Sequence, residues 1–215
     1  MVNISDFENA KEILNYLRRS VRPKKIQEGK GFFIPDEGFR EPATEDFYRA
    51  AVLLAQAEGD PLTAARIAVE SAHEGYDFKR IAEKLYEEAY KQARTVIEKA
   101  FIYHEAFELI NVERFFPSDY SSPLELYMEA IEEAEKESPE KALKVARRFR
   151  FSGCGPDFLR LYTKVKGQVP EEWARFLAKH SLANSYLRKL EERGRKEHAD
   201  EIRRLLEKYQ REKDE

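Results

Sequence analysis

The stretch that decides the fold runs from Thr44 to Gly75 and reads TEDFYRAAVLLAQAEGDPLTAARIAVESAHEG. Thr44 can cap a helix that continues to about Glu58, because apolar residues then recur at helical spacing. Gly59 ends that helix, and Asp60-Pro61 supplies the N-cap and the first residue of the next one. A turn this short makes the two helices antiparallel neighbours. The sequence therefore predicts a helical hairpin at this point.

Outward from this hairpin, Gly and Pro separate further segments with helical periodicity. Ser5 with Glu8 matches a capping box and predicts that the first helix begins there. Residues 78–116 contain neither Gly nor Pro. Within them, Thr95 with Glu98 matches a second capping box, so one long helix and two shorter helices both remain open. We expect an all-α protein, an irregular array of antiparallel helical hairpins (an α-solenoid or a bundle) with about nine helices.

The chain of 215 residues is long enough for one large domain or two small ones. We predict a single helical domain over 1–215, a long irregular loop at 22–43 and a charged C-terminal helix at 195–215. The loop carries a run of apolar side chains that must be buried locally or against a partner. We predict that these residues bind a partner: Phe32, Phe33, Ile34 and Phe39.

Composition narrows the class of protein. Charged residues make up 37% of the chain, against about 25% in ordinary globular proteins, and the excess of Lys, Arg and Glu is typical of thermophile proteins. The net charge of −3 argues against a general polyanion binder.

Cys154 is the single cysteine, which excludes an internal disulfide and a zinc site made of cysteines alone. No apolar run approaches the ~20 residues of a membrane span, and residues 1–9 lack a signal core, so we expect a cytoplasmic protein.

The segment from Tyr48 to Ser71 resembles a tetratricopeptide-type hairpin, with an early aromatic residue, small residues at the helix contact and Gly at the turn. The matching residues are Tyr48, Ala51, Ala55, Gly59, Ala64 and Ala68. The pair of segments from Leu126 to Phe149 is similar but looser. The resemblance implies a binding or scaffold protein that holds a protein or peptide on a concave face. Independently of the resemblance, we count a second copy of the chain, in a homo-oligomer, among the expected partners.

Charge is distributed unevenly in the second half of the chain. Residues 123–140 hold seven glutamates and one lysine, whereas residues 141–166 hold eight basic residues and one aspartate. Aromatic residues are interleaved with the basic ones: Phe149, Phe151, Phe158 and Tyr162. The basic candidates for binding single-stranded nucleic acid are Lys141, Lys144, Arg147, Arg148 and Arg150. The alternative, which we favour, is that the acidic helix and the basic helix neutralise each other as two halves of a hairpin.

Two patterns resemble parts of enzyme sites. Arg175 and His180 have the Arg-x4-His spacing of the helical ribonucleases called HEPN, and that resemblance implies RNA cleavage by the pair at a dimer interface. Phe176 departs from the polar residue that usually follows the Arg. Glu70 and His73 form one Glu-x-x-His pair, but a carboxylate-bridged metal site needs a second such pair, which the sequence lacks.

Cys154 precedes an expected helix start, where backbone amides lower a thiol pKa. No His or Asp is recognisable as its activating partner. The sequence also has no phosphate-binding loop, dinucleotide fingerprint or nucleophile elbow. We therefore expect a binding protein and lean away from an enzyme, with no cofactor and no metal.

Overall fold

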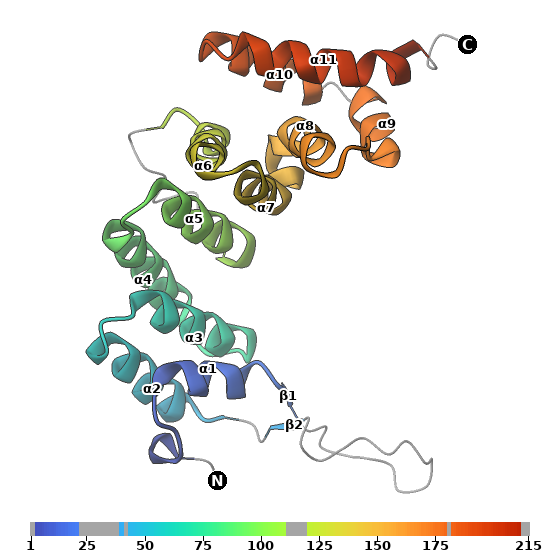
Figure 1. The fold of residues 1–215 in the computed structure, drawn as a ribbon. Helices are drawn as coiled ribbons and strands as arrows, with labels where there is room; N and C mark the ends of the chain where they lie inside the picture. Colours follow the sequence, from blue (N-terminus) through green and yellow to red (C-terminus); the bar gives the residue numbers. More distant parts are fainter. Residues whose placement is uncertain (1–2, 22–38, 41–42, 111–119, 180–181, 212–215) are drawn as a thin grey trace, which may run out of the picture. The chain divides into compact units, whose positions relative to one another are not determined.

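The computed structural model describes residues 3–21, 39–40, 43–110, 120–179 and 182–211. Eleven α-helices make up most of these residues, which confirms the all-α class (Figure 1). The chain divides into two compact units, Met1–Ala93 with Ile102–Phe115, and Arg94–Phe101 with Phe116–Glu215. The single domain over 1–215 stays a prediction.

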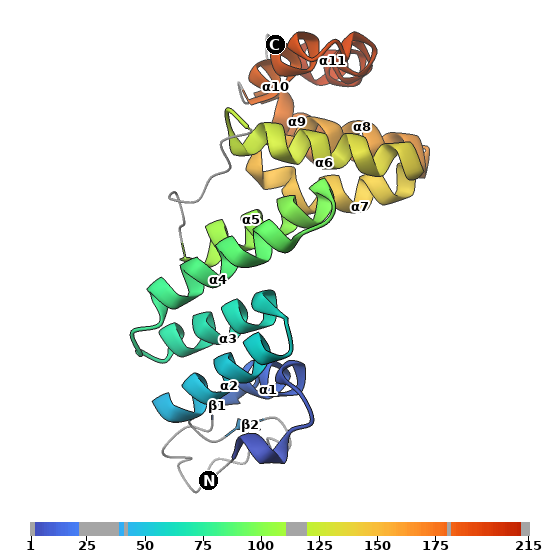
Figure 2. The ribbon, with the colours of Figure 1, turned by 90° about the vertical axis from the view of Figure 1, so that its left-hand side faces the viewer.

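The first unit is built from successive helices that pack side by side (Figures 1 and 2). They are α1 (Ala10–Leu17), α2 (Glu45–Ala57), α3 (Pro61–His73), α4 (Lys79–Gln92) and part of α5 (Val96–Ile110). The predicted caps are present: Thr44 Oγ1 accepts a hydrogen bond from the Phe47 amide at 3.2 Å, and Asp60 Oδ1 accepts one from the Thr63 amide at 2.9 Å. Gly59 turns the chain in the left-handed region, with φ of 72°.

The contact between α2 and α3 is lined by small residues. Tyr48, Ala51 and Ala55 are fully buried on α2, as are Ala64 and Ala68 on α3. Alanine permits close approach of the two backbones. The buried face of α2 is formed by Phe47, Tyr48, Ala51, Val52 and Ala55, whereas Ala50 and Leu54 are only half-buried.

The predicted helix start at Ser5 is wrong. A short 3-10 helix, η1 (Ile4–Asp6), comes first, and α1 begins at Ala10. Asn9 caps α1 by accepting a hydrogen bond from the Glu12 amide at 3.1 Å. The carboxylate of Glu58, distant in sequence, accepts a second bond from the Ala10 amide at 3.2 Å. These two acceptors satisfy the amides of the first turn, so the helix begins where they lie.

The structure divides residues 78–116 into two helices, α4 and α5. Ala93 is extended, with φ of −61° and ψ of 132°. The capping box is formed: the Glu98 amide donates to Thr95 Oγ1 at 3.1 Å, and the Thr95 amide donates to the Glu98 carboxylate at 3.3 Å. Reciprocal capping satisfies amides that a new helix leaves unpaired, which favours a break over one long helix.

The first unit also contains an ionic cluster that joins three helices. Arg66 on α3 donates two hydrogen bonds to the Glu105 carboxylate on α5, at 2.6 and 2.7 Å. The hydroxyl of Tyr86 on α4 donates to the same carboxylate at 2.9 Å. Burial raises the pKa of Tyr86, and the charge of Glu105 raises it further. The cluster therefore links α3, α4 and α5 through their side chains.

Besides the first residues of α5, the second unit contains six described α-helices. They are α6 (Pro123–Glu137), α7 (Pro139–Phe149), α8 (Gly155–Lys166), α9 (Glu171–Lys179), α10 (Leu182–Glu192) and α11 (Lys196–Arg211). Helices α6, α7 and α8 lie side by side, and α11 packs on α8, α9 and α10 (Figure 2). Ser138 ends α6 and caps α7, its hydroxyl accepting from the Lys141 amide at 3.1 Å. The described helices outnumber the expected nine because residues 78–110 form two helices and the segment after Pro170 forms three, α9, α10 and α11.

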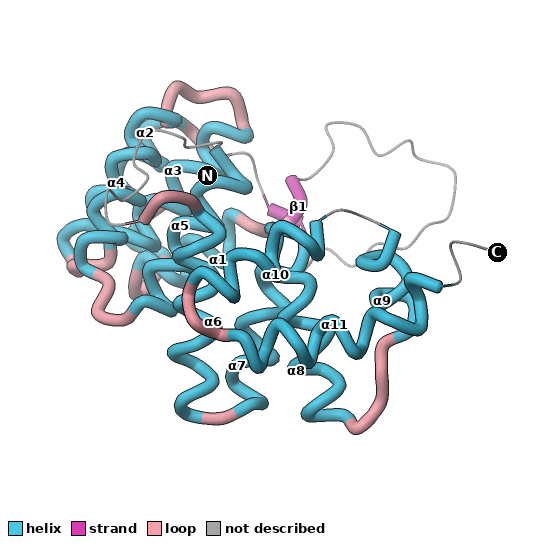
Figure 3. Tube along the Cα trace, turned by 90° about the horizontal axis from the view of Figure 1, so that it is seen from above, coloured by secondary structure: helices cyan, strands magenta, loops and turns pink. Residues whose placement is uncertain are grey.

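The described strands are very short. β1 (Ser20–Val21) pairs in parallel with β2 (Phe39–Arg40), with Ser20 opposite Phe39 (Figure 3). They flank most of the predicted loop at 22–43. Phe32, Phe33 and Ile34 lie outside the described residues, and only the backbone of Phe39 is described. No described helix is long and apolar enough to cross a membrane.

Candidate functional site

The junction between α7 and α8 is a π-helical turn, η3 (Arg150–Cys154). Gly153 lies inside it with φ of 102°, a conformation that L side chains rarely adopt. A Cβ at this position would also lie 3.0 Å from Leu124 Cδ1. The backbone is not helical at Ser152 and Gly153, so the chain bends between the two helices. This bend leaves Phe151 exposed over 73% of its surface.

Phe151 is one of four aromatic side chains that contact one another, called the Trp173 cluster: Phe151, Phe158, Trp173 and Phe176. The Trp173 ring lies 5.3 Å from Phe151 and 5.8 Å from Phe158, both edge-on, and stacks on Phe176 at 5.2 Å, measured between centroids. Phe176 is 40% exposed. The cluster therefore presents aromatic surface to solvent from three elements, η3, α8 and α9.

Trp173 is held in place by the start of α8. Its Nε1 donates a hydrogen bond to the Gly155 carbonyl oxygen at 3.0 Å. A cavity of about 80 Å³ lies next to the exposed rings. Its lining consists of Arg150, Phe151, Gly153, Gly155, Pro156, Phe176 and Leu177. The result is a small, mostly apolar opening with an ordered aromatic wall.

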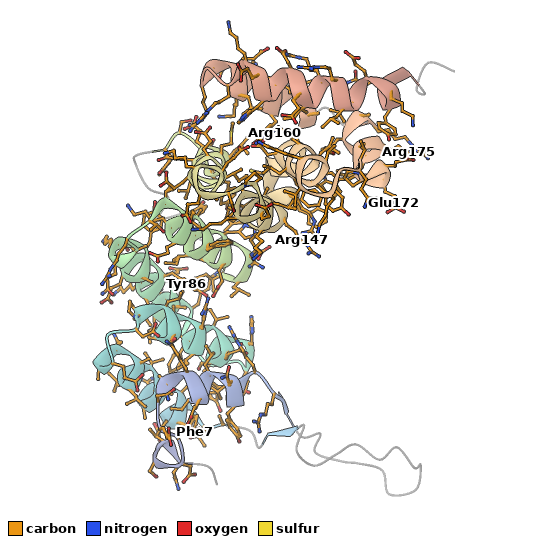
Figure 4. All side chains as sticks on the ribbon, viewed as in Figure 1. Phe7, Tyr86, Arg147, Arg160, Glu172 and Arg175 are labelled. Atoms are coloured by element: carbon orange, nitrogen blue, oxygen red, sulfur yellow. The ribbon has the colours of Figure 1, made fainter. Side chains whose placement is uncertain are left out.

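Basic side chains border this aromatic surface along α7. The Arg150 guanidinium lies 4.3 Å from the Phe151 ring centroid and donates to the Arg147 carbonyl oxygen at 2.5 Å. Lys144 and Arg147 are exposed (Figure 4 labels Arg147). Within the described part of the chain, none of these three side chains has a carboxylate partner. We call Lys144, Arg147 and Arg150 the basic edge.

The carboxylates of α6 pair mainly with residues other than those of α7. Glu135 accepts two hydrogen bonds from Arg160, at 2.9 and 2.7 Å, and Glu125 pairs with Lys189 at 3.2 Å. Glu132 pairs with Arg193 and Arg195, at 3.3 and 3.2 Å.

On α7, Lys141 does pair with Glu137, but the neutralisation expected between the two helices does not extend to the basic edge. The reason is that α7 packs through Ala142, Val145, Ala146 and Phe149, which places its basic residues on the opposite face.

A buried polar network surrounds Arg160 on α8, the helix that also carries Phe158 of the Trp173 cluster. Arg160 and Asp157 are 1% and 2% exposed, and Arg160 Nε donates to Asp157 Oδ1 at 2.9 Å. The buried Tyr186 hydroxyl donates to the other Asp157 oxygen. Burial would raise the pKa of Glu135, but the hydrogen bonds and charge of Arg160 outweigh it and lower that pKa to about 2. The network ties α6, α8 and α10 together.

Cys154 is fully buried. Burial raises its thiol pKa well above the usual value, and the negative charge of Asp157 acts in the same direction. The lowered pKa expected at a helix start is therefore wrong, because desolvation of the thiolate outweighs the backbone amides.

Among the described residues, the remaining sequence candidates do not assemble into a site. Arg175 pairs with Glu171 at 3.6 Å, while His180 lies outside the described residues. Glu70 pairs with Arg18 at 3.7 Å. Among the residues that the structure describes, no three His, Cys, Asp or Glu side chains are grouped so as to hold a metal ion.

Sequence reasoning located only part of the aromatic surface. Phe151 was among the interleaved aromatics, but Phe149 belongs to the core, stacked on Tyr127 at 4.4 Å. Sequence reasoning did not single out Trp173 and Phe176 as parts of this surface. No local sequence pattern marks these two side chains as exposed, because adjacent residues are buried together on other helices, such as Ala51 and Val52 on α2.

The fold and this surface define the class: an all-α helical array with an exposed aromatic and basic face. Comparisons with protein-family models, curated proteins and solved structures found no match to the chain.

Proposed function

We propose that this chain is a protein-binding module and that the Trp173 cluster, with its basic edge, contacts the partner. The observation that carries the proposal is the exposure of Phe151, 73%, within an otherwise packed set of rings. Trp, Phe and Arg are the residue types enriched at protein interfaces and their energetic hot spots. All three occur together here.

Energetics favour the same conclusion. Fully covering one exposed large apolar side chain stabilises a complex by about 1.5–3 kcal/mol. Phe151, 73% exposed, can contribute most of this, and Phe176, 40% exposed, a smaller part. The hydrogen bond from Trp173 to Gly155 orders the central ring before binding, which reduces the entropy lost on association. The surface therefore has apolar area to bury and little ordering cost.

The resemblance of Tyr48–Ser71 to tetratricopeptide hairpins supports a binding module of the same general kind. Its small residues occupy buried positions between α2 and α3, as close helix packing requires. Assembly of further copies of this chain is a second form of the same proposal. The loop residues Phe32, Phe33, Ile34 and Phe39 remain proposed partner contacts.

A random peptide display library would test the proposal without knowledge of the partner. Peptides are selected for binding to the chain of 215 residues. Each selected peptide is then tested for binding to a double variant that carries both Phe151→Ser and Phe176→Ser. The matched control is Leu53→Ser, which removes another exposed apolar side chain, 64% exposed, from α2. We expect peptides that bind the parent chain and the control but not the double variant. A library that enriches nothing dependent on Phe151 and Phe176 would contradict the proposal.

Binding of single-stranded nucleic acid is the second candidate function. Exposed Lys144 and Arg147 lack carboxylate partners among the described residues, and exposed rings can stack on bases. Against it, α9 presents the exposed carboxylates Glu171 and Glu172 beside Trp173.

A labelled oligonucleotide titrated at low and physiological salt decides between the two functions. We expect weak binding or none. Micromolar binding that falls steeply with salt, and is lost in Arg147→Glu with Arg148→Glu, would favour the nucleic-acid function. Arg175 and His180 would then be tested for cleavage.

A further inference from the structure

We infer that the partner is a polypeptide segment with an apolar anchor and acidic residues on one flank only. The anchor enters the cavity beside Phe151, and the acidic flank lies along the basic edge. This inference rests on the proposed function and specifies the chemistry of the ligand.

The cavity selects the anchor. Its volume of about 80 Å³ provides room for one aliphatic side chain but is small for a large ring system. Phe151, Pro156, Phe176 and Leu177 contribute apolar walls, and Gly153 and Gly155 complete the lining. A residue such as Leu or Val therefore suits the opening, with the exposed face of Phe151 covering the neighbouring backbone.

The basic edge selects the acidic flank. Arg150 uses one of its donors on the Arg147 carbonyl and lies against the Phe151 ring. A guanidinium has five N–H donors, so the other donors can receive a carboxylate. Arg147 and Lys144 extend the same positive surface along α7, on the side of the helix away from α6. Such donors form strong, charge-assisted hydrogen bonds with carboxylates.

The opposite border of the cluster carries the reverse charge. Glu171 and Glu172 are exposed at the start of α9, immediately before Trp173. Figure 4 shows Arg147 on α7, with Glu172 and Arg175 on α9. Glu172 has no ion pair with any described residue, whereas Arg175 is directed to Glu171. A segment that is acidic on both flanks would meet Glu172, so the charge pattern fixes the direction of the bound chain.

The same asymmetry disfavours a nucleic acid. A strand carries a phosphate on each side of any base, and one of the two sides would approach Glu171 and Glu172. A polypeptide can be acidic on one side alone, which matches the surface.

Trp173 supplies the readout, because it is the single tryptophan of the chain. The full-length protein is titrated with tryptophan-free 11-residue peptides while Trp173 emission is followed. The peptides carry a central Leu with acidic residues before it, after it or on both sides, or with neutral or basic flanks, and a matched set carries Ala at the centre. Oligo(dT) is titrated in parallel.

We expect one of the two singly acidic Leu peptides to bind about tenfold more tightly than the neutral one, the scale of a few exposed ion pairs. The Ala peptide should lose most of this binding. Lys144→Glu with Arg147→Glu, both exposed and outside η3, should reverse the preference towards the basic flank. Glu172→Lys should increase the affinity for the peptide that is acidic on both sides. Leu53→Ser should change nothing.

The outcomes separate the inference from the proposed function. Equal binding of all Leu peptides, dependent on Phe151, overturns the acidic segment and leaves a protein-binding face. Oligo(dT) binding that quenches Trp173 while no peptide does so overturns both. If neither peptides nor oligo(dT) change Trp173 emission, the inference fails, and the display selection alone decides the proposed function.

Discussion

Trp173 donates the hydrogen of its indole nitrogen to the carbonyl oxygen of Gly155, at 3.0 Å. The bond joins α9 to the first residue of α8, directly after the π-helical turn that exposes Phe151. The aromatic face therefore depends on a position where the side chain is a single hydrogen atom.

Replacing Gly155 by Ala should displace the indole. The added Cβ would lie 3.1 Å from both Trp173 Cζ2 and Leu177 Cδ2, and 3.2 Å from the Arg150 carbonyl oxygen. The backbone at Gly155 is helical, with φ of −54°, so crowding is the only cost, about 1–3 kcal/mol. We expect a changed Trp173 emission spectrum and lower stability to urea.

Gly167→Ala provides the control for that change. Gly167 has φ of 66°, but nothing lies within 4 Å of an added Cβ. It should cost about 1 kcal/mol of backbone strain without altering the Trp173 spectrum. An unchanged spectrum in Gly155→Ala would show that the indole is not held as described.

The ion pair between Glu135 and Arg160 should make stability depend on acid pH. The folded-state pKa of Glu135 is about 2, below its ordinary value of 4.5. A lowered pKa contributes stability above pH 4.5, which is lost as the pH falls from 4.5 towards 2. The lowering of the Glu135 pKa from 4.5 to about 2 corresponds to about 3 kcal/mol of folding free energy.

Urea unfolding at a series of pH values between 6 and 2.5 measures this contribution. Glu135→Gln should be less stable at pH 6 and should lose less stability on acidification than the parent chain. Glu172→Gln, at an exposed carboxylate without an ion pair among the described residues, is the control. Parallel pH profiles for the parent chain and Glu135→Gln would exclude the proposed contribution.

The predicted single domain can be tested with a substitution in the first unit. Tyr86→Phe removes the hydroxyl that donates to Glu105 at 2.9 Å, and loss of a hydrogen bond to a charged group costs about 1.5–3 kcal/mol. Trp173 reports on the second unit alone, while far-UV circular dichroism reports on all helices. If 1–215 is one cooperative domain, the variant shifts both urea transitions together. A circular dichroism transition that splits while the Trp173 transition stays in place would establish two domains.

The apolar loop residues predict a phenotype that needs no partner. Replacing Phe32, Phe33 and Ile34 by Ser should weaken self-association or partner binding while the helical circular dichroism signal persists, since we expect these side chains to be buried against another chain. Analytical ultracentrifugation with circular dichroism measures both properties. A variant that unfolds would instead assign the three residues to the core.

The sequence alone determined the helical class and several helix starts. Thr44 and Asp60 act as predicted, and Thr95 forms the capping box of one of the two alternatives, because a cap and the amide that it satisfies are only three residues apart. Such local bonds do not depend on the rest of the fold, so they can be recognised in a single sequence.

Tertiary structure decided everything that depends on distant neighbours. Glu58 helps to move the start of α1 away from Ser5, and Arg160 takes the Glu135 carboxylate. Only packing distinguished buried Phe149 from exposed Phe151, two residues apart in sequence. The physical reason is that burial and ion pairing are properties of the space around a side chain, and that space is filled by residues brought together from many positions along the chain.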